Sequence, residues 1–221
     1  MKLAVLFSGG KDSCLALHKA RLIGHEINYL LNVNPKTKDS WMFHKPELKL
    51  LRRQAKELGI KLIIENSLGE KEKELVDLKR LILRVKNKVE GIIVGGIASN
   101  YQGNRVKKIC DEIGLKFIAP ILDYTPEKLW KEMLDSNFEV ILTKISCEGL
   151  GKEWIGKKIN KNNFLELMKL AEKYKFRLDF EGGEAESAVL NMPEFKNKIK
   201  LDFSIVSEDK YRHFLSILKI I

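Results

Sequence analysis

The sequence predicts an α/β protein, with a parallel-sheet domain at the N-terminal end and a smaller α/β domain after it. In the first half of the chain, short apolar runs alternate with amphipathic helical stretches. This alternation is typical of a parallel sheet covered by helices on both faces. After Pro120 the regular alternation of strand and helix patterns ends. We therefore expect a boundary near Asp123, with domains spanning residues 1–123 and 124–221.

Strand and helix patterns follow one another in order through the first half. The expected strands are Leu3–Phe7, Ile27–Val33, Lys61–Glu65, Gly91–Val94 and one that begins at Phe117. Apolar residues at helical spacing predict a helix after each of the first four, over about residues 12–22, 48–58, 75–85 and 106–113. Gly59 and Gly114 follow two of these helices, at positions where glycine commonly ends a helix.

The second half is expected to be a smaller mixture of helices and strands. Its predicted elements are a helix over Pro126–Leu134, a strand over Glu139–Ile145, a glycine-rich segment at 148–151, a helix that carries Phe164 and Leu167, and a polar loop over Glu181–Ser187. Alternating apolar residues from Ile199 to Ile205 predict a half-buried strand. The chain is expected to end in a helix around Phe214–Leu218, and the tryptophans Trp130 and Trp154 to lie in the core.

Composition excludes several classes of protein. The 221 residues are 44% hydrophobic and 32% charged, which is typical of a folded globular chain and not of a disordered one. No apolar run approaches the roughly 20 residues of a membrane span. The first apolar run stops at Ser8, too early for a signal peptide. A cytoplasmic location without membrane contact is therefore expected, with Cys14, Cys110 and Cys147 as buried thiols.

The net charge of +10 has two readings. It comes from 40 Lys and Arg against 30 Asp and Glu, and it suggests affinity for a nucleotide, an RNA or an acidic protein surface. The lysines are nevertheless spread along the whole chain, and glutamine occurs only as Gln54 and Gln102. Such a balance is common in hyperthermophile proteomes, so the charge can also reflect the proteome and not a partner.

One predicted loop contains the residue types of a phosphate-binding site. Ser8-Gly9-Gly10-Lys11-Asp12-Ser13 follows the first predicted strand and opens a helix. The glycines allow a tight turn close to a ligand, and the N–H groups of a helix's first turn favour an anion. The serine hydroxyls and the Lys11 ammonium add donors. A carboxylate beside phosphates is repulsive unless a divalent cation bridges them, so Asp12 indicates a phosphate site that uses Mg²⁺.

This loop resembles the PP-loop of the ATP pyrophosphatase superfamily, whose members cleave ATP to AMP and pyrophosphate. The resemblance implies an adenine nucleotide alpha hydrolase-like, Rossmann-like fold for the first domain. Three further segments narrow the family: Ser40-Trp41-Met42-Phe43-His44, Gly96-Ile97-Ala98-Ser99-Asn100-Tyr101-Gln102 with Arg105, and Glu181-Gly182-Gly183-Glu184-Ala185-Glu186-Ser187. Together with the loop, they resemble the archaeal diphthine–ammonia ligase (diphthamide synthase) family over the full length of the chain. Ala185, Ser187, Asn100 and Gly103 depart from the residues usual in that family.

The resemblance implies ATP-dependent amidation of diphthine on translation elongation factor 2, with ammonium as the nitrogen source and Mg²⁺ as the metal. It implies Lys11, Asp12, Glu184 and Glu186 as catalytic residues, with Asp12 on the metal. The implied nucleotide-binding residues are Ser8, Gly9, Gly10, Lys11, Asp12, Ser13, Ser40, Met42, His44, Gly96, Ser99, Tyr101, Gln102 and Arg105. Glu181, Gly182, Gly183, Glu184 and Glu186 are the implied acceptor-binding residues, which could take a metal, an ammonium or a substrate amine.

Two other functions are compatible with the loop. A tRNA-modifying PP-loop enzyme, of the thiolase or lysidine-ligase type, would suit the positive charge, and Cys110 with Cys147 could form a distant thiolation pair. Against a nucleic-acid partner, the chain has no zinc knuckle and no stripe of aromatics interleaved with arginines. A non-catalytic nucleotide-binding regulator is the third reading, and three glutamates beyond the loop argue against it because binding alone does not need them.

Overall fold

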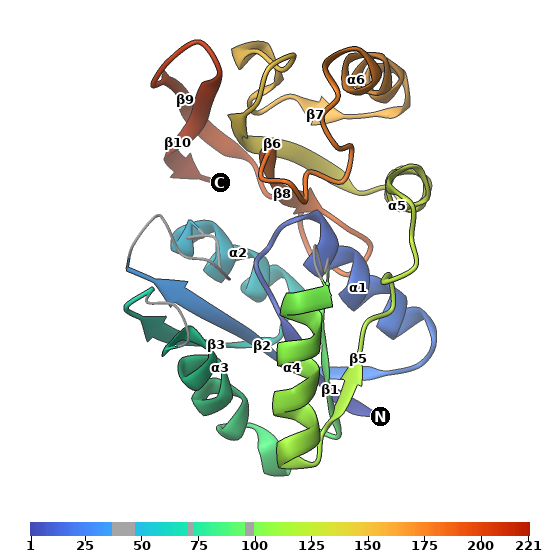
Figure 1. Cartoon of the computed structure of the whole chain (residues 1–221), viewed down its shortest axis with the longest axis vertical. Coiled ribbons are helices and arrows are strands. Elements are labelled where there is room, and N and C mark those ends of the chain that lie inside the picture. The colour runs from blue at the N-terminus through green and yellow to red at the C-terminus, as the bar shows by residue number, and fades with distance from the viewer. Residues whose placement is uncertain (37–46, 70–72, 96–99) are drawn as a thin grey trace. The chain divides into compact units, whose positions relative to one another are not determined.

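The protein is described from a computed structural model, which covers residues 1–36, 47–69, 73–95 and 100–221, with the backbone alone at 100–102. The chain divides into two compact units, Met1–Leu122 and Asp123–Ile221. The first contains a parallel sheet with helices and the second an antiparallel sheet with helices (Figure 1). The predicted fold class is confirmed. No described helix is long and apolar enough to span a membrane.

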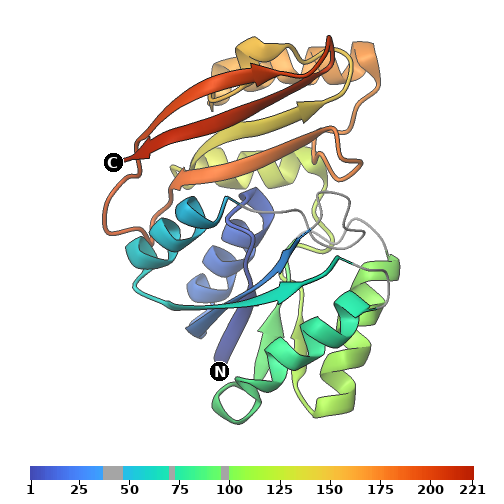
Figure 2. The same cartoon turned by 90° about the vertical axis from the view of Figure 1, so that its left-hand side faces the viewer.

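The first unit alternates strands and helices. Its elements are β1 (Lys2–Leu6), α1 (Lys11–Leu22), β2 (Glu26–Pro35), α2 (Leu48–Leu58), β3 (Lys61–Ser67), α3 (Lys73–Leu83), the short 3₁₀ helix η1 (Lys86–Lys88), β4 (Gly91–Ile93), α4 (Asn100–Ile113) and β5 (Lys116–Ile118). The sheet order is β3-β2-β1-β4-β5, and every neighbouring pair is parallel. Figure 2 shows α1 and α2 on one face of this sheet and α3 and α4 on the other.

The strand order places the loop after β1 at a particular point of the sheet. Beyond β1 the chain builds β2 and β3 on one side, then returns to place β4 and β5 on the other. The order therefore reverses between β1 and β4. In open α/β sheets, ligands bind outside the carboxyl ends of the strands at such a reversal.

The core of the first unit explains why the helices form where they do. Leu78, Leu81 and Ile82 of α3 pack with Val106 and Cys110 of α4 against the apolar side chains of the central strands. These five side chains are less than a tenth exposed, and they recur at helical spacing in each of the two helices. Because both faces of the sheet are covered, the strands are apolar on both sides.

The second unit contains α5 (Pro126–Asp135), β6 (Glu139–Ser146), η2 (Lys152–Trp154), β7 (Lys158–Ile159), α6 (Lys161–Tyr174), β8 (Ala185–Asn191), β9 (Leu201–Ser207) and β10 (Arg212–Ile220). Its antiparallel sheet has the order β7-β6-β10-β9, with β8 also paired to β6. Figures 1 and 2 show α5 and α6 on one face of it. Trp130 and Trp154 are buried as predicted, and the Trp130 indole N–H donates to the Leu178 carbonyl at 2.8 Å.

Three expectations for this half of the chain are wrong. The final segment is not a helix, because Phe214–Leu218 lies inside β10, which forms a hairpin with β9. The predicted loop at Glu181–Ser187 ends early, since β8 begins at Ala185. Cys147 is only partly buried, although Cys14 and Cys110 are buried as expected.

Candidate active site

The loop Ser8–Ser13 is built by the end of β1 and the start of α1. Pairing with β2 continues one residue past β1, where the Phe7 N–H donates to the Leu31 carbonyl at 2.8 Å. The chain then turns through Gly9, whose φ of +77° favours glycine. Gly10 is the N-cap of α1 and provides no side-chain cap. The N-terminus of α1 is therefore free of a capping side chain at the end that attracts anions.

The two serines brace this turn. The Ser13 hydroxyl donates to the Gly10 carbonyl at 3.1 Å and accepts the Ser8 N–H at 3.3 Å. The Ser8 hydroxyl lies 3.2 Å from that of Ser13 and accepts the Gly10 N–H at 3.3 Å. Both hydroxyls thus fix the loop's own conformation.

Lys11 and Asp12 form a largely buried ion pair. Lys11 is 3% exposed, and its ammonium donates to Asp12 Oδ2 at 2.8 Å. The other carboxylate oxygen, Oδ1, is buried and has no hydrogen-bond partner among the described residues. A buried carboxylate oxygen without a donor is costly, and a hard cation such as Mg²⁺ prefers such an oxygen as a ligand. The residues present therefore fit a Mg²⁺ ion at Asp12.

Gly95, the second residue after the end of β4, packs against the start of α1. A β-carbon at Gly95 would lie 2.7 Å from the Ser13 nitrogen and 2.9 Å from its α-carbon. No side chain fits there without moving the helix terminus. Gly95 was not among the predicted site residues, although a glycine pair at the end of a predicted strand was the available signal.

Two buried carboxamides hold the carbonyls of the loop and were also missed. Gln54 of α2 donates to the Gly9 carbonyl at 2.8 Å, and Asn32 of β2 donates to the Phe7 carbonyl at 2.9 Å. The available signal was a polar residue at a core position: Asn32 interrupts an apolar strand, and Gln54 follows Leu51 on the buried face of its helix.

The acidic segment of the second unit is a hydrogen-bonded turn. The Glu184 carboxylate accepts the Arg177 N–H at 3.2 Å through Oε1 and the Gly182 N–H at 2.9 Å through Oε2. Gly183 has a φ of +86°. Glu186 lies on β8, where its carboxylate accepts from the Lys144 ammonium at 3.1 Å. Glu184 therefore shapes the turn, while Glu186 belongs to the adjoining sheet.

Two groups beside this turn have raised pKa values. Burial, with a further contribution from the negative charge of Glu184, raises the pKa of the Cys147 thiol to about 11. The hydrogen bond and charge of Asp179 raise the pKa of Arg177. Within the described part of the chain, no three His, Cys, Asp or Glu side chains are grouped to hold a metal ion.

Several predicted site residues cannot be placed. Ser40, Met42, His44, Gly96 and Ser99 lie outside the described residues. Tyr101 and Gln102 belong to the first turn of α4, with only their backbone described, and Arg105 is a partly buried residue of the same helix. The structure thus brings together Ser8–Ser13 in the first unit, and Glu181–Glu186 in the second.

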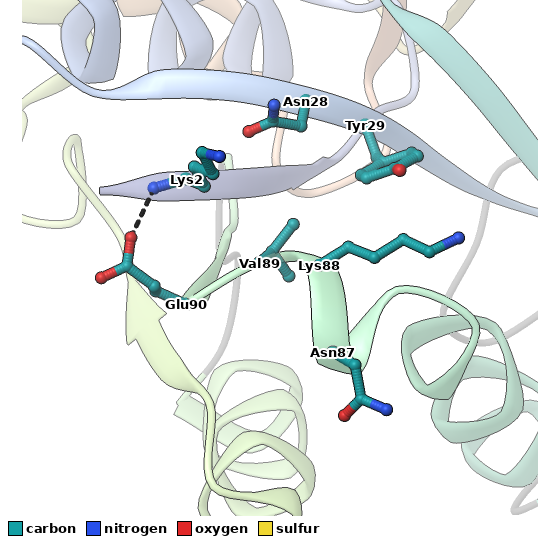
Figure 3. Close-up of a pocket in the computed structure, with 7 residues that line it drawn as sticks. All are labelled: Lys2, Asn28, Tyr29, Asn87, Lys88, Val89 and Glu90. Carbon is teal, nitrogen blue, oxygen red and sulfur yellow. Dashed lines mark hydrogen bonds between the residues drawn. The ribbon is translucent and has the colours of Figure 1, made fainter.

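A separate cavity lies at the other end of the parallel sheet. Its volume is about 550 Å³, and it is lined by Lys2, Asn28, Tyr29, Asn87, Lys88, Val89 and Glu90 (Figure 3). Lys2 begins β1 and Glu90 directly precedes β4, so the cavity lies at the amino ends of these strands. This is the edge opposite the loop, away from where parallel sheets bind nucleotides.

The fold and the loop define the class of protein. A five-stranded parallel sheet with a glycine-rich loop between β1 and α1 is the arrangement typical of nucleotide-binding α/β proteins. Residues 1–117 match the family model of the diphthamide synthase N-terminal domain, and residues 125–220 match that of the diphthamide synthase C-terminal domain. The chain belongs to the diphthamide synthase family.

Curated relatives agree with this family. A protein named diphthine–ammonia ligase from Homo sapiens is 32% identical over 228 residues, covering 93% of this chain and 85% of that protein. Another of that name from Schizosaccharomyces pombe is 33% identical over 220 residues, covering 91% of this chain and 36% of that protein. The predicted enzyme class, a ligase, is confirmed.

A solved structure described as a predicted subunit of tRNA methyltransferase, from Methanocaldococcus jannaschii, aligns with a TM-score of 0.47 and 15% identity. The alignment covers 87% of this chain and 98% of that one. A similarity this low supports no conclusion about function.

Proposed function

We propose that the protein amidates diphthine on translation elongation factor 2, using ATP and ammonia and giving diphthamide, AMP and pyrophosphate. The observation that carries the proposal is the loop Ser8–Ser13, with a buried lysine and a carboxylate oxygen available to a cation, in a chain whose two halves match both diphthamide synthase domains. The names of the curated relatives supply the acceptor and the nitrogen source.

The chemistry requires activation of a carboxylate. Ammonia displaces a carboxylate oxygen only after that oxygen has become part of a good leaving group. Attack of the diphthine carboxylate on the α-phosphorus of ATP forms an acyl-adenylate and expels pyrophosphate. Ammonia then attacks the acyl carbon and AMP leaves, so the amide bond replaces the acyl–phosphate bond. The protein's share is to position the reactants and neutralise charge.

The loop supplies that positioning. The N–H groups at the start of α1 would hold the departing pyrophosphate, and the Lys11 ammonium would offset its charge. Asp12 would hold Mg²⁺ through Oδ1. Once bound, this ion would neutralise negative charge on the phosphates. Ser40, Met42, His44, Gly96, Ser99, Tyr101, Gln102 and Arg105 are proposed to complete the nucleotide site.

The acidic turn is proposed to take the second reactant. Glu181, Gly182, Gly183, Glu184 and Glu186 would bind the cationic groups of the acceptor or the incoming ammonium. Glu184 would do so chiefly by shaping the turn, since its carboxylate already accepts two backbone N–H groups. Glu186 has a side chain that is 29% exposed, which leaves it accessible for an acceptor.

No observation favours the thiolation alternative. It depends on reactive thiolates at Cys110 and Cys147, but burial is the largest cause that raises the pKa of each thiol to about 11. Thiols with such values are protonated at neutral pH and are poor nucleophiles.

The products of ATP provide the test. The protein would be incubated with ATP, Mg²⁺, ammonium and diphthine-bearing elongation factor 2, and each reactant omitted in turn. We expect AMP and pyrophosphate in equal amounts over many turnovers only when the factor and ammonium are both present. Without ammonium, the reaction should stop after about one pyrophosphate per protein molecule. ADP and phosphate as products, or AMP formed equally well with unmodified factor, would contradict the proposal.

A further inference from the structure

The peptide carbonyls of the loop are held by side chains from two other elements. In a loop that binds phosphate through N–H groups, carbonyl oxygens must point away, because a carbonyl dipole aimed at a phosphate oxygen is repulsive. A carbonyl that points into the protein needs a hydrogen-bond donor there. Without one, its burial costs about as much free energy as a lost hydrogen bond. The donors that meet this need determine which way the loop's peptide groups face.

Gln54 serves the carbonyl of Gly9. It is 1% exposed on α2, and its Nε2 donates to that carbonyl at 2.8 Å. A β-carbon at position 9 would lie 2.0 Å from Gln54 Oε1, so the carboxamide occupies the space that any side chain would need there. The two residues are 45 positions apart in the sequence. Glycine at position 9 therefore leaves the space that the Gln54 carboxamide needs to reach the Gly9 carbonyl.

Asn32 serves the carbonyl of Phe7. It lies on β2, is 7% exposed, and donates through Nδ2 at 2.9 Å. Phe7 directly precedes Ser8, so this bond fixes the peptide group that leads into the loop. Of the two orientations of the Asn32 amide, only this one puts a donor against the carbonyl, which settles its assignment chemically.

We propose that Gln54 and Asn32 are positioning residues for the phosphate site. They hold the Gly9 and Phe7 carbonyls inward from α2 and β2. This fixes the turn that leads into α1, so that the N–H groups in the first turn of α1 face the β- and γ-phosphates of ATP. Neither side chain touches the reacting atoms. This inference rests on the proposed function, because it requires a phosphate ligand at the loop.

The test compares variants of the same helix by calorimetric titration with Mg·ATP and, separately, with inorganic pyrophosphate. Gln54→Met keeps the length of the side chain and removes its donor. We expect about tenfold weaker binding of both ligands, the consequence of losing one buried hydrogen bond. In turnover, the KM for ATP should rise while the KM for ammonium stays at the parent value.

Leu51→Val is the matched control, because Leu51 is 1% exposed on α2 and makes no contact of this kind with the loop in the described structure. It should lower the melting temperature without changing affinity for either ligand. If Gln54→Met does not fold, Asn32→Leu, which also keeps the shape and removes the donor, carries the same expectation.

Parent-like affinity for pyrophosphate in a folded Gln54→Met or Asn32→Leu would overturn the proposal. So would a loss of affinity in Leu51→Val equal to that in Gln54→Met, since a general loosening of α2 would then explain both. Failure of the parent protein to bind either ligand would instead remove the proposed function, and this inference with it.

Discussion

At the scale of single residues, the two oxygens of the Asp12 carboxylate lie in different surroundings. Oδ2 accepts from the Lys11 ammonium, and Oδ1 is buried with no hydrogen-bond partner among the described residues. A lysine that is 3% exposed needs a counter-charge, which Asp12 provides. The pair thus keeps a cationic group in place within the proposed phosphate site.

Removal of the lysine should remove nucleotide binding. Lys11→Ala deletes the ammonium and leaves the Asp12 carboxylate without its counter-charge, which repels phosphate. We expect affinity for ATP to fall at least about a hundredfold, as for a buried charged partner worth several kcal/mol, and turnover to be nearly abolished. The measurement is calorimetric titration with Mg·ATP, with Lys56→Ala, an exposed lysine of α2, as the control. If Lys11→Ala binds ATP and turns over as the parent does, the loop Ser8–Ser13 is not the phosphate-binding loop.

Removal of the Asp12 charge should act through the metal. Asp12→Asn keeps the size of the side chain and replaces an anionic ligand with a neutral one, which hard cations bind less well. The fold should remain intact by circular dichroism, while the Mg²⁺ concentration needed for half-maximal turnover rises. An unchanged dependence on Mg²⁺ would place the metal elsewhere.

The sequence predicted the loop but not the side chains that support it. Six consecutive residues in a strand–turn–helix context identify the loop because the chemistry requires those residue types in that order. Gln54 and Asn32 show only as polar residues in apolar patterns. Which carbonyl each one serves depends on tertiary packing, and a single sequence does not contain that information.

At the scale of elements, the segment that follows β4 packs closely against the start of α1, where the loop ends. Gly95→Ala would place a methyl group 2.7 Å from the Ser13 nitrogen. We expect a loss of about 1–3 kcal/mol in the free energy of unfolding, as for other overpacked sites, together with weaker ATP binding because the start of α1 is displaced.

Gly114→Ala is the control for that variant. Gly114 has a φ of +73° after α4 and open space around its β-position, so alanine strains the backbone there without a clash. Both variants should lower stability in urea titrations, and only Gly95→Ala should weaken ATP binding. Equal effects on ATP binding would show that the approach of β4 does not matter to the loop.

The elements of the first unit were predicted well, and those at the end of the second were not. In α2 and α3 the buried apolar residues form one stripe along the helix, so their spacing in the sequence alone predicts these helices. Phe214–Leu218 contains closely spaced apolar residues that suit a helix or a strand equally. Its partner β9 decides the outcome, with Phe214 opposite Val206 and Ile217 opposite Phe203. Pairing of this kind depends on another segment of chain and not on local propensity.

At the scale of the whole molecule, the two units carry different groups: the phosphate loop in the first and the acidic turn in the second. A double variant, Glu184→Gln with Glu186→Gln, should therefore bind ATP with parent affinity by calorimetry and fail to amidate the factor. Amidation at the parent rate would show that the turn has no part in the reaction. Loss of ATP binding would assign these carboxylates to the nucleotide and contradict the division between units.

This chain is proposed to form an amide on the factor with nitrogen from ammonium. The direct measurement is mass spectrometry of diphthine-bearing elongation factor 2 after incubation with the protein, ATP, Mg²⁺ and ammonium labelled with heavy nitrogen. We expect one labelled nitrogen per factor, confined to the peptide that carries the modified histidine, and none with Lys11→Ala. An unlabelled factor in a reaction that consumes ATP, or label at another site, would contradict the account.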